Sequence, residues 1–459
     1  MNYKELNCEL SARLNLESSF DIQCRKLKAA GVAEASFYSI SGFLDDKIAE
    51  RLLEFVVKAR DPGDALFNIP HHDVTITDDI DKITDSIMVG KAVLSVDGFG
   101  SVAIIDAKSY PLRSVEEPEN DRVLRGPRDG FGESLVRNTS LIRRRLRDPN
   151  LFMERITVGS PARTDVALCY VNGKADAQFV DNIRNKLNNI NIQALNMTQE
   201  SLAECLIHRG WYNPFPKIRY TERPDAAAAM LEEGSVLVIC DNSPQVMILP
   251  TSIFDFMQET DDFYFPPLVG TYLRIVRSLI FFLALILTPI WYLLLKDPSS
   301  LPEWLSFINI SEPAKIPLLI QLLLAEFMID GLKLASLNTP NMLSNSLSVV
   351  GGLILGDYAV QAGWFAPQTI LYMAIVAIAA FTQQSYELGY AFKFLRIILL
   401  ILVEIFGIFG LIGGLIFAAV IIAVNKTVKG SRSYLYPLIP FNARAFIRMF
   451  IRPRLRKDK

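Results

Sequence analysis

The sequence predicts an α/β cytoplasmic region of two related subdomains, followed by an all-α polytopic membrane domain. Three observations predict this class. The 459 residues have a mean hydropathy of +0.26, which is high for a soluble protein. Residues 1–267 hold 30 basic and 40 acidic side chains, whereas residues 268–459 hold 17 and 9. The same order of predicted elements also occurs twice before residue 267. This composition excludes a disordered chain, a collagen and a disulfide scaffold.

The first copy of the repeated order begins with a strand at 35–40 and an amphipathic helix at 45–59. A helix that ends at Gly90 and a hairpin that turns on Asp97–Gly98 follow. Glycine suits the left-handed cap of a helix, and Asp-Gly supplies the positive φ of a tight hairpin turn. We therefore expect the first subdomain to occupy residues 1–150.

The second copy repeats these elements in the same order. A strand at 166–171 precedes a helix at 175–190, and a second helix at 225–233 stops at Gly234. The closing hairpin turns on Asp241–Asn242. We expect the second subdomain to occupy residues 151–267.

The membrane domain is expected at residues 268–430, with a basic cytoplasmic tail at 431–459. Its apolar stretches are 279–295, 316–329, 347–364, 369–381 and 397–424. A helix needs about 20 apolar residues to cross a bilayer, so the first and last stretches are long enough. The middle three are short and polar, and such segments must face protein or a water-filled cavity.

The positive-inside rule gives the orientation. Ten basic residues and one acid follow Val424, so the C-terminus is expected in the cytoplasm. The first 21 residues do not resemble a signal peptide, so the N-terminus is expected there too. An even number of crossings is then required, although five stretches are present. Either the stretch with Glu326 lies along the interface, or 397–424 folds into two passes around its glycines.

A row of small and polar residues is the candidate pore lining. It consists of Asn341, Asn345, Ser348 and Gly352, whose spacing puts them on one helical face. Such a face lines an ion path, or it serves close packing between helices. Asp357 falls on another side of this helix and is better placed against a neighbouring helix or subunit.

Acidic residues in the other apolar stretches are candidates for cation selectivity or for helix packing. Glu326, Asp330 and Lys333 form a one-sided row, which indicates a water-facing interfacial helix or an acidic ring at a cation path. Glu404 stands alone in a long apolar run. It is either functional or a protonated hydrogen-bonding group between helices.

The residues give little sign of catalysis. The five cysteines include no CxxC pair, so we expect no metal site and no disulfide framework. Nucleotide-binding loops and nucleophile elbows do not occur, so we expect no cofactor and no enzyme activity. Residues from Phe131 onward predict a helix, with Glu133 early and arginines late, as the helix dipole prefers. The arginine cluster at 143–145 is better explained as a solvated or interdomain salt-bridging face than as a site for nucleic acid or lipid headgroups. We expect no nucleic-acid partner.

Several collinear motifs give a family resemblance. GPRDGFGESLVRNTSLIRRR at 126–145 resembles a signature of the A subunits of GerA-type spore germination receptors. The likeness continues in YTERPD at 220–225, FPPLVGTYLRIVR at 265–277 and VGGLILGDYAVQAGWFAP at 350–367. The ending YPLIPFN at 436–442 is similar to the stage V sporulation protein AF branch of that family. The signature supplies candidate coupling residues: Gly126, Pro127, Arg128, Gly130, Phe131, Glu133, Asn138, Arg143, Arg144 and Arg145.

The resemblance implies homo-oligomeric rings, described as pentamers in the family, that act as multi-pass ion channels in the spore inner membrane. For the AF branch it implies release of ions that amplifies germination, together with a small membrane partner protein. Nutrient sensing belongs to a separate subunit, and the family's pore lies at the equivalent of 345–356. Gln321 departs from the glutamate of many family members, which weakens the case for an acidic ring there. A non-conducting scaffold or signalling adaptor, and a secondary transporter, remain alternatives.

Overall fold

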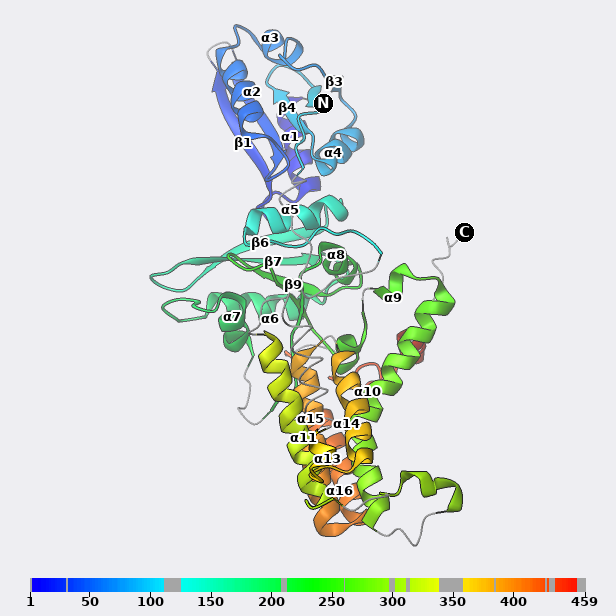
Figure 1. The fold of residues 1–459 in the computed structure, drawn as a ribbon. Coiled ribbons are helices and arrows are strands. Elements are labelled where there is room, and N and C mark those ends of the chain that lie inside the picture. Colours follow the sequence, from blue (N-terminus) through cyan, green and yellow to red (C-terminus); the bar gives the residue numbers. More distant parts are fainter. Residues whose placement is uncertain are drawn as a thin grey trace. The chain divides into compact units, whose positions relative to one another are not determined.

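The computed structural model describes the whole chain except for several segments. The gaps are residues 1, 30–31, 111–124, 208–212, 260, 297–301, 311–313, 338–357, 384, 426, 429–433 and 452–459. The chain divides into two compact units (Figure 1). The N-terminal unit comprises 1–209, 217–251 and 427–432, and the helical unit comprises 210–216, 252–426 and 433–459.

The first half of the N-terminal unit is a five-stranded antiparallel sheet with helices on both faces. Its strands are β1 (Ile22–Ala29), β2 (Val32–Ile40), β3 (Val74–Thr77), β4 (Ala92–Val96) and β5 (Val102–Ile105), in the order β1-β2-β4-β5-β3. Its helices are α1 (Tyr3–Leu14), α2 (Asp46–Lys58), α3 (Pro62–Phe67) and α4 (Ile80–Val89). Helices α2 and α3 share one apolar core with the sheet, and α1 and α4 share the other.

The second half repeats this architecture. Its strands are β6 (Leu151–Val158), β7 (Thr164–Val171), β8 (Arg219–Thr221), β9 (Val236–Cys240) and β10 (Val246–Leu249), in the order β6-β7-β9-β10-β8. Its helices are α5 (Leu135–Arg145), α6 (Ala177–Asn188), α7 (Thr198–Leu206) and α8 (Pro224–Glu232). Helices α6 and α7 cover one face, and α5 and α8 cover the other. The strand order matches that of the first sheet, which confirms the predicted α/β class.

Local signals account for most of the element ends. Asp45 caps α2 by accepting hydrogen bonds from the amides of Lys47 and Ile48. Gly90 and Gly234 follow α4 and α8 at φ +97° and +90°, in the left-handed region that glycine tolerates. These elements therefore form where the sequence predicts them.

One predicted helix start is wrong. The helix of the arginine-rich segment begins at Leu135, after an extended Ser134, and not at Phe131. The amide of Phe131 donates instead to the carbonyl of Glu222 at 2.8 Å. A tertiary hydrogen bond thus takes the place of a first helical turn.

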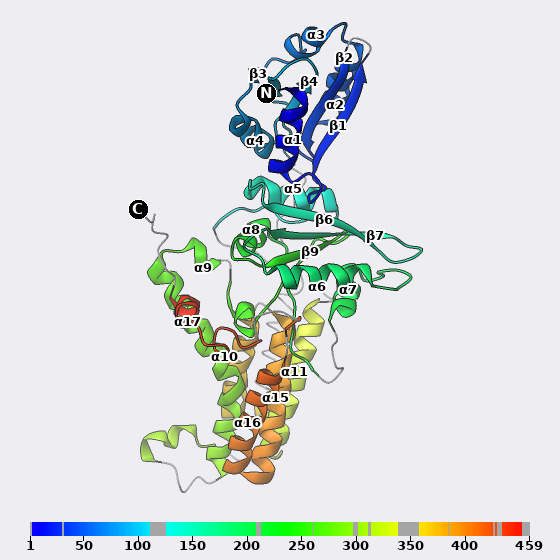
Figure 2. The same cartoon turned by 180° about the vertical axis from the view of Figure 1, so that it is seen from behind.

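The helical unit is built around long helices that pack side by side (Figure 2). Its α-helices are α9 (Asp261–Tyr264), α10 (Pro267–Lys296), α11 (Leu318–Leu337), α13 (Ala359–Gln361), α14 (Pro367–Phe381), α15 (Tyr386–Phe406), α16 (Ile408–Val424) and α17 (Ala443–Phe450), and its 3-10 helices are η1 (Ile253–Met257) and η3 (Glu303–Ile308). Helix α10 contacts both α14 and α15, and α11 contacts α14. Among the described residues, only α10 is long and apolar enough to cross a membrane. Helices α14 and α16 are shorter apolar helices.

The long apolar stretch at 397–424 is not one helix. It breaks at Gly407, whose φ is +59°, into α15 and α16. A Cβ on Gly410 would lie 2.0 Å from the carbonyl oxygen of Leu402, and one on Gly414 would lie 2.5 Å from Leu399. These contacts define an antiparallel helix pair that only glycines allow to approach so closely. The alternative in which the stretch folds around its glycines is therefore the one that the structure adopts.

Candidate functional site

Helix α5 of the signature segment lies between the two sheets of the N-terminal unit (Figure 1). Its Leu141 and Ile142 are buried in the core of the second sheet. On the first half, a Cβ added to Gly42 would lie 3.2 Å from Cβ of Ser140, and the guanidinium of Arg144 lies 4.8 Å over the ring of Tyr110. The helix therefore joins the two halves.

Arg143 is the buried centre of this joint. Its side chain is 0% exposed, and that of Asp21 is 1% exposed. Nε and Nη2 donate to the two carboxylate oxygens of Asp21 at 2.6 and 3.0 Å. Nη1 donates to the carbonyl of Asp148 at 2.9 Å, and Nη2 also donates to that of Leu151 at 2.8 Å. Bidentate pairing and two carbonyls thus satisfy a charge that would be very costly to bury alone.

The rest of the signature anchors the loop before α5. Asn138 is fully buried, and its side-chain amide exchanges hydrogen bonds with the backbone of Gly132 at 2.6 and 2.9 Å. The carbonyl of Glu133 accepts from the amide of Asn242 at 2.7 Å. Both carboxylate oxygens of Asp129 accept from Nη2 of Arg145, at 2.5 and 2.6 Å. Candidates Gly126, Pro127, Arg128 and Gly130 lie in the irregular segment that these contacts hold.

The helical unit contains a second buried cluster of charges. Nε of Arg396 on α15 donates to Oε1 of Glu326 on α11 at 2.6 Å, and Nη1 donates to the carbonyl of Ala284 on α10. Lys393 pairs with Asp330, and its Nζ lies 3.7 Å from Oε2 of Glu326. The side chains of Glu326 and Arg396 are 4% and 5% exposed. The water-facing alternative is therefore wrong for Glu326.

The cluster has an excess of positive charge and a small void beside it. Glu326 and Asp330 face three cations, Lys333, Lys393 and Arg396, which gives a net formal charge of +1. All five line a cavity of about 20 Å³. A void of that size is large enough for one water molecule, and the lining is polar enough to hold it.

Glu404 also has a cationic partner. Its carboxylate lies 2.8 Å from Nζ of Lys296 at the end of α10 and accepts from the hydroxyl of Tyr292 at 2.5 Å. The side chain is 44% exposed in the isolated chain. Glu404 therefore has a cation and a hydroxyl donor from α10 beside it, so it is both ion-paired and hydrogen-bonded between two helices.

The other membrane candidates cannot be placed. Asn341, Asn345, Ser348, Gly352 and Asp357 lie outside the described residues. Their role in an ion path stays a prediction.

Gln321 stands where the resemblance leads one to expect glutamate, and its side chain is buried. Its side-chain carbonyl oxygen accepts hydrogen bonds from the amide of Ala366 and the hydroxyl of Thr369 at 2.9 and 3.0 Å.

The partners of these charges are the residues that sequence patterns missed. Asp21 carries no pattern that points to Arg143, which is 122 residues away. Lys393 and Arg396 stand directly before the predicted stretch that begins at Ile397, and so they were left outside it. The sequence did contain a signal for these two cations. They are three residues apart, which places them on one face of a helix that continues into an apolar stretch.

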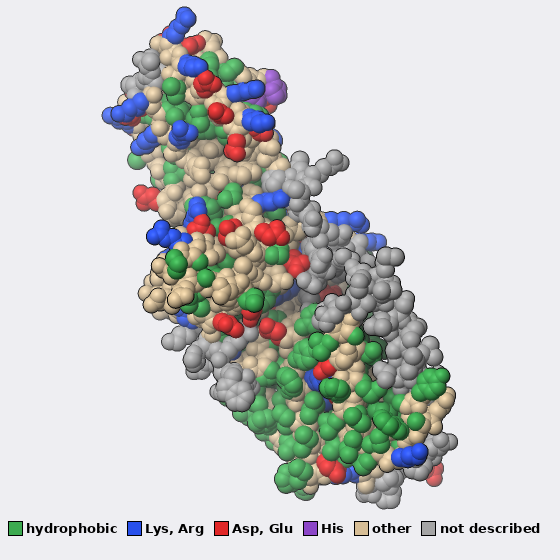
Figure 3. Space-filling model, turned by 60° about the vertical axis from the view of Figure 1, so that its left-hand side comes forward, with side chains coloured by type: hydrophobic (Ala, Val, Ile, Leu, Met, Phe, Trp, Pro, Cys, Tyr) green, Lys and Arg blue, Asp and Glu red, His purple; other side chains and the backbone are tan. Residues whose placement is uncertain are grey.

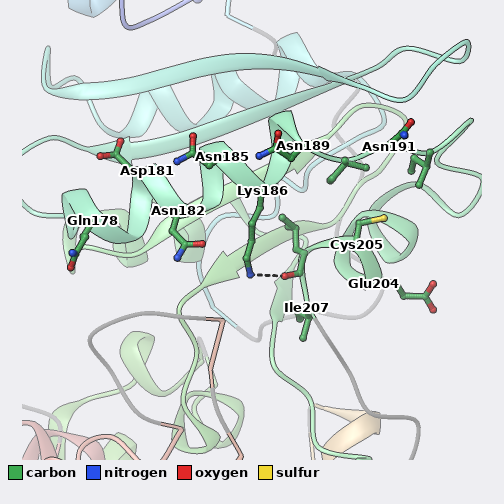
Figure 4. Close-up of a pocket in the computed structure, with 13 residues that line it drawn as sticks. Gln178, Asp181, Asn182, Asn185, Lys186, Asn189, Asn191, Glu204, Cys205 and Ile207 are labelled. Atoms are coloured by element: carbon green, nitrogen blue, oxygen red, sulfur yellow. Dashed lines mark hydrogen bonds between the residues drawn. The ribbon is translucent and has the colours of Figure 1, made fainter.

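The second half of the N-terminal unit has an open groove of about 790 Å³ beside α6 and α7. Its α6 wall carries amides from Asn182, Asn185 and Asn189 (Figure 4). The lysine in the groove, Lys186, already donates to the carbonyl of Leu206 at 2.9 Å. Within the described residues, no group of three or more His, Cys, Asp or Glu side chains is placed to hold a metal.

The cysteines are free thiols, two of them buried. Burial raises the pKa of the Cys240 thiol to about 12 and that of Cys169 as well. Both thiols are therefore protonated at neutral pH, the form that is a poor nucleophile and a poor metal ligand.

The profile of the Bacillus/Clostridium GerA spore germination proteins matches residues 10–459. This chain belongs to the GerA family. Stage V sporulation protein AF of Bacillus subtilis (strain 168) is 36% identical to it over 448 residues, which cover 96% of this chain and 90% of that protein. The predicted family is therefore confirmed.

Two further relatives of this GerA family member extend the comparison. The uncharacterized membrane protein YfkQ of Bacillus subtilis (strain 168) is 33% identical over 83% of this chain and 74% of its own length. The crystal structure of the N-terminal domain of the A subunit of the Bacillus megaterium spore germinant receptor GerK3 has 26% sequence identity to this chain. The match between the two structures covers 52% of this chain and 91% of that domain, with a TM-score of 0.39.

Proposed function

We propose that this GerA family member is a homo-oligomeric ion-channel subunit in the spore inner membrane, which releases ions and so amplifies germination. The N- and C-termini lie in the cytoplasm, and the helical unit crosses the membrane several times. Asn341, Asn345, Ser348 and Gly352 line the path for ions. The protein acts as a conductor and not as an enzyme.

The observation that carries the proposal is the distribution of polarity in the helical unit. Large apolar side chains point outward, with Leu279, Ile378 and Phe409 at 59%, 62% and 80% exposure. Charged Glu326 and Arg396 are inside. On the face in Figure 3, hydrophobic side chains cover much of the helical unit, while charged ones are scattered over the N-terminal unit. A chain that exposes apolar residues and buries charges suits a bilayer or an oligomer within one.

In this proposal the two charge clusters have different roles. The joint at Arg143 makes the halves of the N-terminal unit move together, which suits the reception of a signal. The cluster of Glu326, Asp330, Lys333, Lys393 and Arg396 fixes α11, the helix that directly precedes the candidate pore segment. A change in these ion pairs would reorient α11 and open or close the path.

Cysteine accessibility tests the pore assignment directly. The native cysteines all lie in the N-terminal unit, so a cysteine placed in the helical unit is the single thiol there. In planar bilayers, a small charged thiol reagent should block the current of Ser348→Cys. It should leave the wild type and the matched control Ala419→Cys unaffected, because Ala419 lies on the exposed face of α16.

Two results would count against the proposal. A current that the reagent leaves intact in Ser348→Cys, with labelling of that thiol shown by mass, would remove the pore assignment. A well-folded protein without any current, alone or with its small membrane partner, would favour the non-conducting adaptor.

A further inference from the structure

The short 3-10 helix η3, which follows α10 in the chain, divides its side chains among three faces. A 3-10 helix has about three residues per turn, so side chains three positions apart lie over one another. In η3 each face holds two side chains of one kind: Glu303 with Ser306, Trp304 with Phe307, and Leu305 with Ile308. One face is therefore polar, one is aromatic and one is aliphatic.

The aliphatic face holds η3 against the long helices. Ile308 is 5% exposed and belongs to the apolar core that also contains Trp291 of α10, and Leu305 packs against that core. The indole Nε1 of Trp291 donates to the carbonyl of Ile308 at 3.1 Å. The side-chain amide of Gln368 on α14 donates to the carbonyl of Asn309 at 3.2 Å. These contacts fix the orientation of η3 on the helical unit.

The aromatic face points away from the protein. Trp304 and Phe307 are 74% and 72% exposed. The polar face, with Glu303 and Ser306, is exposed as well. In both ribbon views η3 reaches sideways from the bundle at the end of α10 that is far from α9 (Figures 1 and 2). Protein, aromatic and polar sides on one segment suit a place where protein, an apolar medium and water meet.

The level of η3 along α10 agrees with such a place. Residues 278–295 of α10 carry no charged side chain, and Arg277 and Lys296 stand at their two ends. These 18 residues span about 27 Å, close to the roughly 30 Å of a hydrocarbon core. Trp291, which binds η3, lies about 7.5 Å inside the Lys296 end. Interfacial segments lie about 5–10 Å into the boundary between headgroups and acyl chains.

Other exposed aromatic side chains gather at the same end of the unit. Tyr358 and Trp364, on either side of α13, are 67% and 56% exposed. Gln368, four residues after Trp364, is the residue that bonds to Asn309 beside η3. Tryptophan and tyrosine concentrate at membrane boundaries because each joins an apolar ring to a polar group that stays near water. A lipid boundary therefore explains this set of side chains better than a protein partner, which would bury the polar groups too.

We propose that η3 is an interfacial anchor whose Trp304 and Phe307 enter the headgroup boundary of the bilayer that holds α10. Glu303 and Ser306 then face water. This rests on the proposed function only in placing the helical unit in a bilayer. Residues 302–310 contain no lysine or arginine, so the anchor binds the lipid surface whatever its headgroup charge. Because interfacial aromatic anchors help to set the tilt of a spanning helix, η3 controls how α10 crosses the membrane.

Fluorescence quenching of the full-length protein in phosphatidylcholine vesicles tests the anchor. The protein has four tryptophans, and the difference between the wild type and Trp304→Phe isolates the emission of Trp304. Three quenchers are compared: a lipid spin-labelled near the headgroup, a lipid spin-labelled at the end of its acyl chain, and iodide in the water. Trp304 should lose most emission with the first, less with the second and least with iodide. Phosphatidylglycerol added to the vesicles should not change this order.

The matched control is Trp291→Phe, which isolates the emission of a tryptophan that is 2% exposed. Trp291 should lose less emission than Trp304 with the headgroup label and with iodide. The largest loss of Trp304 emission with iodide would place its ring in water, and the largest loss with the chain-end label would place it in the hydrocarbon. Either result would overturn the anchor. Little loss with all three quenchers would mean that protein covers η3, which would overturn it too.

The anchor and the proposed channel fail in different ways. A protein that conducts ions while iodide quenches Trp304 most would overturn the anchor alone. A protein that carries no current but keeps the expected order of quenching would support the anchor and contradict the channel. A protein that does not enter vesicles would contradict the membrane location on which both proposals rest.

Discussion

Arg143 in the N-terminal unit and Arg396 in the helical unit are both buried against a carboxylate, yet the two sites differ in their connections. Arg143 is matched to one acid, Asp21, through two hydrogen bonds, and two carbonyls occupy its other donors. Arg396 shares Glu326 with Lys393, and the cluster holds more cations than acids beside a small void.

The difference teaches which of the two sites is able to change. A closed one-to-one pair has a single good arrangement, because any movement leaves a buried charge unpaired. A shared cluster has alternatives, because Glu326 keeps a cation nearby when one partner leaves. The first suits a rigid joint and the second suits a switch next to the candidate pore.

The largest effect is expected at the rigid joint. Arg143→Met should lower the free energy of unfolding of the N-terminal unit by about 3–5 kcal/mol, because it leaves Asp21 buried without a partner. Thermal unfolding followed by circular dichroism would measure it. The matched control is Arg144→Met, which loses a contact with Tyr110 worth about 0.5–1 kcal/mol. Equal losses in the two variants would contradict the special place of Arg143.

A smaller loss is expected at the shared cluster. Arg396→Gln should destabilise the helical unit by about 1–3 kcal/mol, since Lys393 still lies near Glu326. The double variant Arg396→Gln/Glu326→Gln should recover part of this loss, because no carboxylate is then left buried without the guanidinium, while Lys393 still pairs with Asp330. Unfolding in mixed detergent micelles would measure both. A loss at Arg396 larger than that at Arg143 would break the distinction between the two sites.

The close approach of α15 and α16 at their glycines allows the packing of the helical unit to be tested as well as its ion pairs. Gly410→Ala should cost about 1–3 kcal/mol, because the new methyl group would lie 2.0 Å from the carbonyl oxygen of Leu402. Gly413→Ala is the control, since a Cβ there meets nothing within 4 Å. The same unfolding measurement applies. If the two alanines had equal effects, the close antiparallel pair would be wrong.

The smallest effect is expected at an exposed pair in the N-terminal unit. Arg155 lowers the pKa of Asp165 below its ordinary value of 3.8. A lowered pKa in the folded state stabilises the protein above the unfolded pKa, and this stabilisation disappears as the pH falls through the folded pKa. Arg155→Gln should therefore cost roughly 0.2–1 kcal/mol at neutral pH, because the pair is solvent-exposed.

Unfolding of the wild type and Arg155→Gln would be compared from pH 7 downward. The difference in stability between them should shrink as the pH falls below the ordinary pKa of Asp165. A difference that persists or grows at low pH would show that Arg155 acts through something other than this carboxylate.

The sequence was most informative where signals are local. Asp45, Gly90 and Gly234 act on their own backbone neighbourhood, so the helix that Asp45 begins and the helices that the two glycines end form where expected. The repeated order of those elements led to two sheets with one strand order. Even the break at Gly407 was among the predicted alternatives.

Long-range pairing could not be read in the same way. Asp21 and Arg143, or Glu326 and Arg396, meet only because the tertiary fold brings them together. The early start predicted for α5 failed for the same reason, because the amide of Phe131 bonds to Glu222 rather than within a helix. Single residues carry no periodicity, so their partners emerge only from the structure.

The measurement that tests the central claim most directly is the current of the purified full-length protein in planar lipid bilayers. The account predicts a ring-shaped oligomer with ion currents that Ser348→Trp abolishes without loss of assembly. The control Ala419→Trp, on the exposed face of α16, should conduct like the wild type. Wild-type currents that persist unchanged in Ser348→Trp, or a correctly assembled oligomer that conducts no ions, would contradict it.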